Sequence, residues 1–277
     1  MEMLNNERPE SDAELTLALC HALEHTLVLV PSYTGLEPHT QACLEWMTSL
    51  GARVMHSARC PDIALHRSML ATAAYESLSV HNSDRSWILW LDSDVSIDKA
   101  ELWLMFDDSV ALAETFPGLQ ASVAARYLTK LSGQLAATRA PNAQDAHTTS
   151  GKMQPVYSGM GCFLSTVQGF RRHCLKSSKV RLRPDSDKEI FVVCTSGVVF
   201  GVDNHLSWRT EDWSYCASEW EDGAVYLSRA RARHSRLVLS VPVETLWVAD
   251  ATPPEPPADT LVDATSPLPQ VESNSST

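Results

Sequence analysis

Hydrophobic runs and amphipathic stretches alternate along the first half of the chain. Short apolar runs, most of them rich in β-branched residues, predict strands at 25–31, 53–56, 87–91 and 120–124. Apolar residues at helical spacing predict helices at 15–23, 41–50, 62–78 and 99–116. Asp98 is placed to cap the last of these helices, and Pro117-Gly118 to end it. Strands separated by helices of this length predict an α/β fold with a mostly parallel sheet flanked by helices.

Two segments depart from this alternation. Residues 130–155 are dominated by Gly, Ser, Thr, Ala, Asn and Gln and show little periodicity, which predicts a flexible segment over the site. From Thr252 onwards, prolines are interspersed with Ala, Ser, Thr and acidic residues. The sequence therefore predicts one catalytic domain over residues 1–250, followed by a disordered, acidic, Pro-rich tail over 251–277.

Cysteine usage and the apolar runs predict a location. The seven cysteines are odd in number, scattered, and form no C-x-x-C pair. This pattern argues against a structural zinc site and a disulfide framework, and favours a reducing compartment. No apolar run approaches the roughly 18 residues of a membrane-spanning helix, and residues 1–14 lack the basic region of a secretory signal. We expect a cytoplasmic protein, in the host cytoplasm if it is viral.

The charge distribution is uneven. The net charge of −12 disfavours nonspecific binding to nucleic acid. Basic residues nevertheless gather in two segments, 171–183 and 229–236. Either these segments are solvated surfaces or they bind an anion. Arg229, Arg231 and Arg233 alternate along a predicted strand, 224–232 and just beyond, so we expect them on one face and His234 on the other.

The strongest chemical signal is Asp92-Ser93-Asp94, which directly follows the apolar run Trp87–Leu91. Ligands of parallel sheets bind at the carboxyl ends of the strands, where these two acids and the loop from Pro31 to Gly35 are expected. Divalent cations such as Mg²⁺ prefer oxygen ligands and keep positions open for phosphate oxygens. One acid would bind Mn²⁺ or Mg²⁺ while the other reaches a ribose or a metal-bound water. The alternative role for the acids is a turn with a helix cap, which Asp98 fits better.

With this motif the chain resembles the GT-A glycosyltransferases, which use a nucleotide sugar and a D-x-D motif. The resemblance extends over residues 25–245. Arg67 resembles the family's nucleotide-contacting arginine upstream of D-x-D, with Ser68 where the family usually has Asn. The segment Tyr157–Ser165 resembles the Gly-rich strand that lines the donor sugar, where Gly159 and Gly161 would allow a close approach. On its own, that segment is also consistent with a bulged core strand.

Two further segments follow the family's order. Thr210–Cys216 resembles the helix that carries the catalytic base, which makes Glu211 and Asp212 the catalytic candidates for inverting transfer. These acids also suit a helix N-terminus capped by Thr210. His234 lies about where the family has a histidine that completes the metal site.

The resemblance implies a complete set of site residues. It implies a metal bound by Asp92, Asp94 and His234, and a nucleotide-sugar donor, with a UDP-sugar as the first expectation. Donor contacts are expected from Pro31, Ser32, Tyr33, Arg67, Asp92, Gly159 and Gly161.

Other functions remain open at this point. A hydrophobic strand ending in D-x-D also begins the haloacid-dehalogenase-like phosphatases, in which Asp92 would be the nucleophile. That motif normally opens its domain, whereas here about 65 residues of α/β pattern precede it. A third alternative is an inactive module that binds sugar nucleotides or nucleic acid. For a transferase, the acceptor alternatives are a glycan, a protein, or a modified DNA base as in some bacteriophage enzymes, with the two basic segments as the DNA-binding surface.

Overall fold

The computed structural model describes residues 9–32, 35–58, 63–80, 86–116, 122–128, 135–139, 145–181, 188–194, 197–200, 206–209 and 225–234. All of them belong to one compact unit, residues 1–237, and the second unit, 238–277, lies outside the described residues. The helices are α1 (Asp12–Glu24), α2 (Pro38–Ser49), α3 (Ile63–Val80), α4 (Lys99–Thr115) and α5 (Val167–Lys176). The first strands are β1 (Thr26–Ser32), β2 (Arg53–Ala58), β3 (Trp87–Leu91), β4 (Val95–Ser96), β5 (Ser122–Arg126), β6 (Ala137–Arg139), β7 (Ala146–Thr148) and β8 (Gly151–Ser158). The later strands are β9 (Cys162–Thr166), β10 (Lys179–Arg181), β11 (Glu189–Phe191), β12 (Gly197–Phe200), β13 (Leu206–Arg209), β14 (Val225–Arg231) and β15 (Arg233–His234).

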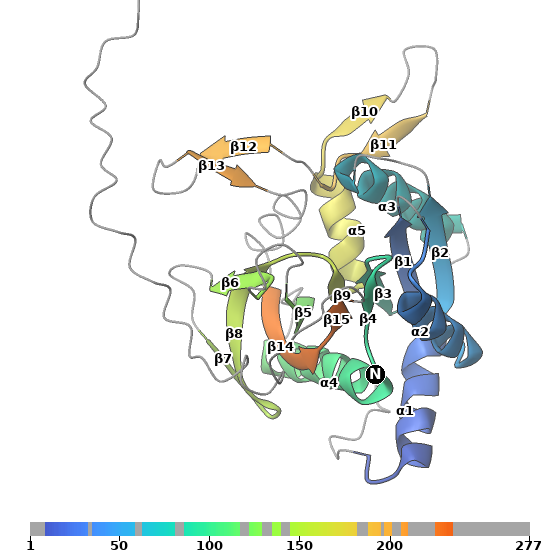
Figure 1. The fold of residues 1–277 in the computed structure, drawn as a ribbon. Helices are drawn as coiled ribbons and strands as arrows, with labels where there is room; N and C mark the ends of the chain where they lie inside the picture. The colour runs from blue at the N-terminus through green and yellow to red at the C-terminus, as the bar shows by residue number, and fades with distance from the viewer. Residues whose placement is uncertain are drawn as a thin grey trace, which may run out of the picture. The chain divides into compact units, whose positions relative to one another are not determined.

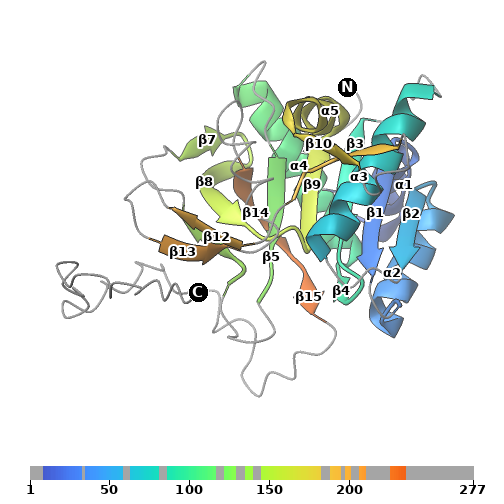
Figure 2. The same cartoon turned by 90° about the horizontal axis from the view of Figure 1, so that it is seen from above.

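A mixed sheet forms the centre of the described structure, in the order β2-β1-β3-β9-β5-β14-β8-β6, with β7 paired to β8 (Figures 1 and 2). β1 is parallel to β2 and β3, and β5 is parallel to β14. Among the described strands of this sheet, β8 and β9 run against the others, since β9 is antiparallel to both β3 and β5. The α/β class and a sheet whose strands mostly share one direction are therefore confirmed.

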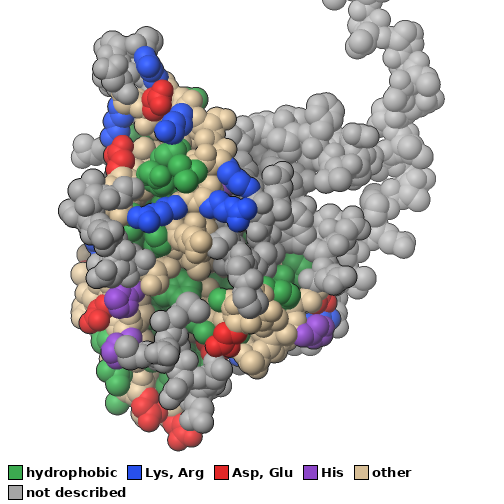
Figure 3. Space-filling model, turned by 180° about the vertical axis from the view of Figure 1, so that it is seen from behind, with side chains coloured by type: hydrophobic (Ala, Val, Ile, Leu, Met, Phe, Trp, Pro, Cys, Tyr) green, Lys and Arg blue, Asp and Glu red, His purple; other side chains and the backbone are tan. Residues whose placement is uncertain are grey.

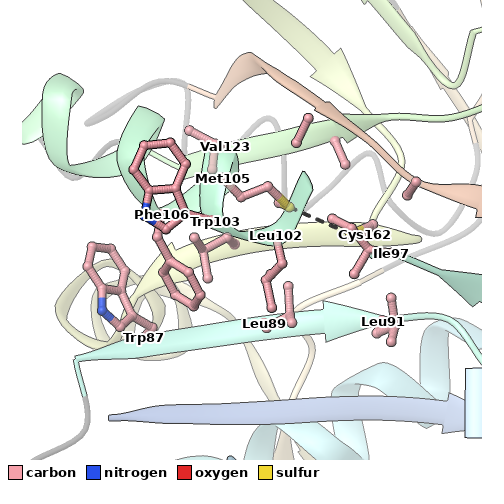
Figure 4. Close-up of a cluster of buried hydrophobic side chains, with 14 of the residues drawn as sticks. Trp87, Leu89, Leu91, Ile97, Leu102, Trp103, Met105, Phe106, Val123 and Cys162 are labelled. Atoms are coloured by element: carbon pink, nitrogen blue, oxygen red, sulfur yellow. Dashed lines mark hydrogen bonds between the residues drawn. The ribbon is translucent and has the colours of Figure 1, made fainter. Parts of the chain in front are cut away.

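The sheet is buried on both faces, as the continuous apolar run in β3 predicts. Side chains of Trp87, Leu89 and Leu91 enter one core cluster, and those of Ile88 and Trp90 enter the other. Figure 4 shows the first cluster, in which residues of α4 such as Met105 and Phe106 pack on β3 and on Cys162 of β9. A strand buried on both faces is held tightly, so its carboxyl end is a rigid support for the residues that follow.

Helices cover both faces of the sheet. α1, α2 and α4 contribute to the cluster around Leu89, whereas α3 and α5 contribute to the cluster around Trp90. In Figure 1, α3 and α5 lie above the sheet and α1 and α4 lie below it. Within the described residues, no helix is long and apolar enough to span a membrane.

The predicted elements in the first half of the chain are confirmed to within a few residues. β3 has the predicted bounds, and Asp98 caps α4 by accepting a hydrogen bond from the Glu101 backbone N–H at 3.0 Å. These elements depend on local periodicity and capping, which the sequence shows directly.

Two predictions for the middle of the chain are wrong. The segment 130–155 is not one long loop, because it contains β6, β7 and the first part of β8, and both β6 and β7 pair with β8. Residues 157–165 do not form one Gly-rich strand, because β8 ends at Ser158 and β9 begins at Cys162. The glycines lie in the connection between two strands, and β9 then inserts between β3 and β5.

Candidate functional site

The turn Asp92-Ser93-Asp94 lies at the carboxyl end of β3, and its main chain is fixed from three sides. The Asp92 N–H donates to the Gly161 carbonyl at 2.9 Å, and the Ser93 carbonyl accepts from the Glu37 N–H at 2.9 Å. Within the turn, the Val95 N–H donates to the Asp92 carbonyl at 3.0 Å. The two carboxylates are therefore presented from a backbone whose geometry is determined by neighbouring elements.

The strand that follows the turn is held by α2. Thr40 donates its hydroxyl hydrogen to the Val95 carbonyl at 2.9 Å, and the Cys43 thiol contacts the Ile97 carbonyl at 3.2 Å. On its other side, β4 pairs with β15, so that His234 lies opposite Val95. This pairing brings a residue from the far end of the described chain beside the acidic turn.

Asp92 is paired with Arg67. The Arg67 guanidinium, which is buried on α3, donates to the Asp92 Oδ1 at 2.7 Å, while 27% of the Asp92 side chain is exposed. A charge-assisted hydrogen bond of this length fixes the orientation of the Asp92 side chain. The pairing joins a residue that the sequence predicts as a nucleotide contact to the first acid of the D-x-D motif.

Asp94 and His234 form the second pair of the site. The His234 Nδ1 lies 3.7 Å from the Asp94 Oδ1, and 22% of the Asp94 side chain is exposed. This distance is longer than a hydrogen bond. In octahedral geometry, two ligands that each lie roughly 2.1 Å from one ion are about 3.0 Å apart when adjacent and about 4.2 Å apart when opposite. The pair lies between these distances, so a small side-chain movement would let the carboxylate and the imidazole bind one divalent cation.

For a metal ion, this arrangement offers two protein ligands, Asp94 and His234. Within the described part of the chain, no group of three or more His, Cys, Asp or Glu side chains is arranged to hold a metal. Asp92, predicted as a third ligand, is paired with Arg67 through its Oδ1. Mg²⁺ in enzymes commonly takes one or two protein carboxylates and completes its shell with substrate phosphates and water. Asp94 and His234 suit a cation that arrives with a phosphate ligand.

The end of β1 lies next to the end of β2, at the same edge of the sheet as the acidic turn. Pro31 and Ser32 pair with Ser57 and Ala58. The Ser32 hydroxyl both donates to the Gly35 carbonyl, at 2.7 Å, and accepts from the Gly35 N–H, at 2.9 Å. Ser32 therefore links the end of β1 to the residues before α2, and Tyr33 lies outside the described residues.

Tyr127 is a site residue that sequence reasoning missed. Its hydroxyl accepts a hydrogen bond from the Gly161 N–H at 2.9 Å, and its ring meets the His234 ring edge-on at 6.3 Å between centroids. A Cβ on residue 161 would lie 2.6 Å from that hydroxyl, so the space created by Gly161 is filled by Tyr127. Gly159 lies beside Ala136, whose carbonyl accepts from its N–H. The available signal for Tyr127 was an aromatic residue directly after the strand 122–126.

Two titratable groups beside the site are neutral. Burial, and to a lesser degree the charges of Cys43 and Asp92, raise the pKa of the Cys162 thiol well above its usual value. Burial, followed by the charges of His56 and Arg67, lowers the pKa of His66. Cys162 is therefore a packed thiol rather than a nucleophile.

The predicted catalytic acids, Glu211 and Asp212, lie outside the described residues, as does the whole segment 210–224. Their role therefore stays a prediction from the resemblance.

The two basic segments do not form one surface. Arg229 donates to Asp108 at 2.7 Å and also pairs with Asp107, both on α4, which covers one face of the sheet. Arg171 donates to the Leu78 carbonyl of α3, on the other face. The expectation that 171–183 and 229–236 together follow DNA therefore has no structural support.

The predicted alternation of Arg229, Arg231 and Arg233 agrees with the burial of β14 and β15. Arg231 and Arg233 are exposed and Arg229 is partly exposed, whereas Ala230 and Ala232 are buried and His234 is largely buried. The register between β14 and β5 shifts between Leu227 and Arg231, and Ala232 separates β14 from β15. Next to this irregularity, the Ser228 hydroxyl and the Arg229 side chain both donate to Asp108.

No protein-family model and no curated protein matches the chain. Among solved structures it is similar to A197 from STIV, with 15% identity and a TM-score of 0.43 over 76% of this chain and 85% of that one. It is also similar to a glycosyltransferase involved in the glycosylation of the major capsid of PBCV-1, with 13% identity and a TM-score of 0.27 over 53% and 63%. A third is the nucleoside-diphosphate-sugar pyrophosphorylase from Vibrio cholerae RC9, with 10% identity and a TM-score of 0.33 over 81% and 83%. The likeness is coarse at these values.

Proposed function

We propose that this chain is a metal-dependent glycosyltransferase of the GT-A type, which moves a sugar from a nucleotide-sugar donor to an acceptor hydroxyl. One observation carries the proposal. The two acids at the end of β3 have different partners, with Arg67 on Asp92 and His234 beside Asp94. In this arrangement Asp92 is a positioned hydrogen-bond acceptor, and Asp94 is one of two candidate ligands for a cation.

In this mechanism Asp94 and His234 would hold Mn²⁺ or Mg²⁺, which would supply charge neutralisation for the leaving nucleoside diphosphate. Asp92, oriented by Arg67, accepts a hydrogen bond from a ribose hydroxyl. Because Arg67 fixes the Asp92 side chain before the donor arrives, little ordering is needed when the donor binds.

The acceptor hydroxyl attacks the anomeric carbon as the bond from that carbon to the diphosphate oxygen breaks. Its proton passes to a carboxylate, and the resemblance assigns this role to Asp212 with Glu211 beside it. General-base help of this kind contributes roughly 10²–10⁴-fold in rate.

The partner of Asp92 favours sugar transfer over the phosphatase alternative. As a nucleophile, Asp92 would attack phosphorus through a carboxylate oxygen. Its Oδ1 receives a 2.7 Å hydrogen bond from the buried Arg67. Such a bond stabilises the carboxylate and makes its oxygen a poorer nucleophile.

A screen of sugar nucleotides tests the proposal through thermal unfolding of the full chain with and without Mn²⁺. At 100 times Kd, a ligand adds about 2.7 kcal/mol to stability, which corresponds to a rise in Tm of roughly 5–10 °C. We expect such a rise with one class of sugar nucleotide, in the presence of Mn²⁺, together with slow hydrolysis of the donor.

The matched variants are Asp94→Ala in the site and Glu45→Gln, an exposed acid hydrogen-bonded to Gln41 on α2. Asp94→Ala should remove the Mn²⁺-dependent rise and Glu45→Gln should keep it. Hydrolysis of a chromogenic phosphate ester that depends on Asp92, without any response to sugar nucleotides, would establish the phosphatase instead.

A further inference from the structure

One part of the surface combines exposed cations with exposed aliphatic side chains. It is formed by the outer face of α5 and by the β10–β11 hairpin, and we call it the basic–aliphatic surface. Leu175 is 66% exposed and Val180 is 44% exposed. The exposed cations of the same two elements and the residue before β11 are Arg172, Lys176, Lys179, Arg181 and Lys188. Of these, Lys179 lies over the Phe191 ring and Arg181 pairs with Glu189 at 3.8 Å. Figure 3 shows Lys and Arg side chains around a hydrophobic patch on this part of the molecule.

The charge of this segment is opposite to that of the whole chain. Residues 167–194 contain seven Lys and Arg against three Asp and Glu, in a chain with a net charge of −12. An ordinary solvated surface of such an acidic protein would carry mixed or negative charge. A local surplus of positive charge indicates an anionic partner.

The surface is built on rigid elements. Phe170 and Cys174 of α5 are fully buried, while Arg172, Leu175 and Lys176 share the outward face at helical spacing. The hairpin is tied to the end of α5, because the His173 Nε2 lies 3.2 Å from the Val193 carbonyl and the Val192 N–H donates to the Ser178 carbonyl at 2.8 Å. The aliphatic side chains are therefore held in the solvent by the fold.

The aliphatic side chains distinguish between anionic partners. A nucleic acid backbone offers phosphates and sugars, so a surface that tracks it gains little from an exposed leucine. An anionic lipid bilayer offers phosphates to the cations and an acyl region to the aliphatic groups. Leu175 and Val180, each flanked in sequence by a Lys, match the second kind of partner.

We propose that the basic–aliphatic surface docks the protein on anionic lipid membranes. Leu175 and Val180 enter the boundary between headgroups and acyl chains, and the surrounding cations contact lipid phosphates. This inference does not depend on the proposed sugar transfer, since it concerns a surface that shares no residue with the Asp92–Asp94 site.

Vesicle co-sedimentation of the full chain tests the proposal. The probes are vesicles of phosphatidylcholine alone and of phosphatidylcholine with phosphatidylglycerol. We expect binding only to the anionic vesicles, weakened on the order of fivefold by the loss of each contacting cation. Replacing Leu175 and Val180 by Ser should weaken binding roughly tenfold or more, because apolar burial is lost.

The matched control is Leu17→Ser, since Leu17 is 61% exposed on α1, a helix with Asp12 and Glu14 in its first turn. Leu17→Ser should leave vesicle binding unchanged. Equal binding of the Leu175→Ser, Val180→Ser variant and the wild type would overturn the proposal, as would salt-sensitive binding to duplex DNA without binding to anionic vesicles. Donor-dependent thermal stabilisation, measured on the same variants, should be unchanged and separates this proposal from the proposed activity.

Discussion

Two pairs of acidic residues, Asp92 with Asp94 and Asp107 with Asp108, each include a contact with an arginine, and the surroundings of the two pairs differ. Asp92, in the turn after β3, accepts a hydrogen bond from the Arg67 guanidinium at 2.7 Å. Its side chain is 27% exposed. Asp108, in α4, is fully buried. Asp108 accepts from the Ser228 hydroxyl at 2.6 Å, from the Arg229 N–H at 2.8 Å and from the Arg229 side chain at 2.7 Å. Its neighbour Asp107 accepts from Ser150 and Arg229.

The difference separates acids that support the fold from acids that can bind a ligand. A carboxylate has about four acceptor positions, and those of Asp108 are largely used by the protein. The acids after β3 retain exposed oxygens beside a positioned arginine and a histidine. Sequence alone does not distinguish the two pairs, because both are short acidic motifs next to apolar residues.

The sharpest test of the comparison is the loss of charge at Asp94. Asp94→Asn keeps the shape of the side chain but weakens a metal ligand, so we expect transfer to fall by about 10³-fold, since metal ions supply several kcal/mol at such sites. The thermal midpoint without ligand should change little, because the side chain is partly exposed. Unchanged activity in a steady-state assay would remove Asp94 from the site.

A second test uses His173, a buried histidine. Burial lowers its pKa from 6.5 to about 4. Below pH 6.5 the unfolded chain binds this proton while the folded chain stays neutral, so stability is lost as the pH falls from 6.5 towards 4. The loss approaches about 3 kcal/mol at pH 4. Denaturant unfolding at a series of pH values should show this slope, and His173→Gln should flatten it; an equally steep slope in the variant would contradict the assignment.

The third test removes a carboxylate from the Asp107–Asp108 pair, whose acceptor positions are used by the protein. Asp108→Ala leaves Ser228 and Arg229 without their main acceptor, and we expect a loss of about 2–3 kcal/mol of stability, moderated by the partial exposure of Arg229. Chemical denaturation would measure it. Asp107→Asn should cost less, because Asp107 is more exposed. Donor binding in the folded Asp108→Ala variant should persist, and its specific loss would mean that the α4 acids belong to the site.

The smallest expected effect is at Tyr127. Tyr127→Phe removes the acceptor for the Gly161 N–H and should cost about 1 kcal/mol of stability. Because the same ring contacts His234, the Mn²⁺ concentration needed for half-maximal donor stabilisation should rise a few-fold. Tyr226→Phe, at a buried tyrosine whose ring stacks on Phe116, is the control. An equal Mn²⁺ response in both variants would leave Tyr127 with a structural role only.

The sequence predicts the first half of the fold because that half depends on local signals. The apolar run of β3, the spacing in α3 and the Asp98 cap each act within a few residues. β9 was not predicted as an antiparallel insertion, because its partners β3 and β5 are distant in sequence and its own pattern does not specify a direction. The β7–β8 hairpin was missed because its few apolar residues, such as Met153 and Val156, are separated by polar ones.

The site was predictable to different degrees. The position of Asp92 and Asp94 follows from a strand end, which is a local feature. The contacts of Arg67 with Asp92 and of His234 with Asp94 agree with the order of motifs in the resemblance, and their roles in a reaction stay predictions. Tyr127 could not be predicted, because its contacts require β5, β9 and β15 to be assembled. The contacts of Arg229 with Asp107 and Asp108 could not be predicted, because α4 and β14 are distant in sequence.

The contact between Gly161 and Tyr127 limits how these positions can change during evolution. A Cβ at position 161 would lie 2.6 Å from the Tyr127 hydroxyl, and the Tyr127 ring lies against His234. Over evolutionary time these three positions should therefore change together or not at all. A distant relative would keep a glycine before its inserted strand, a tyrosine after the preceding strand and a histidine near its end, even where the rest of the sequence has diverged. This triplet offers a signature for collecting the lineage.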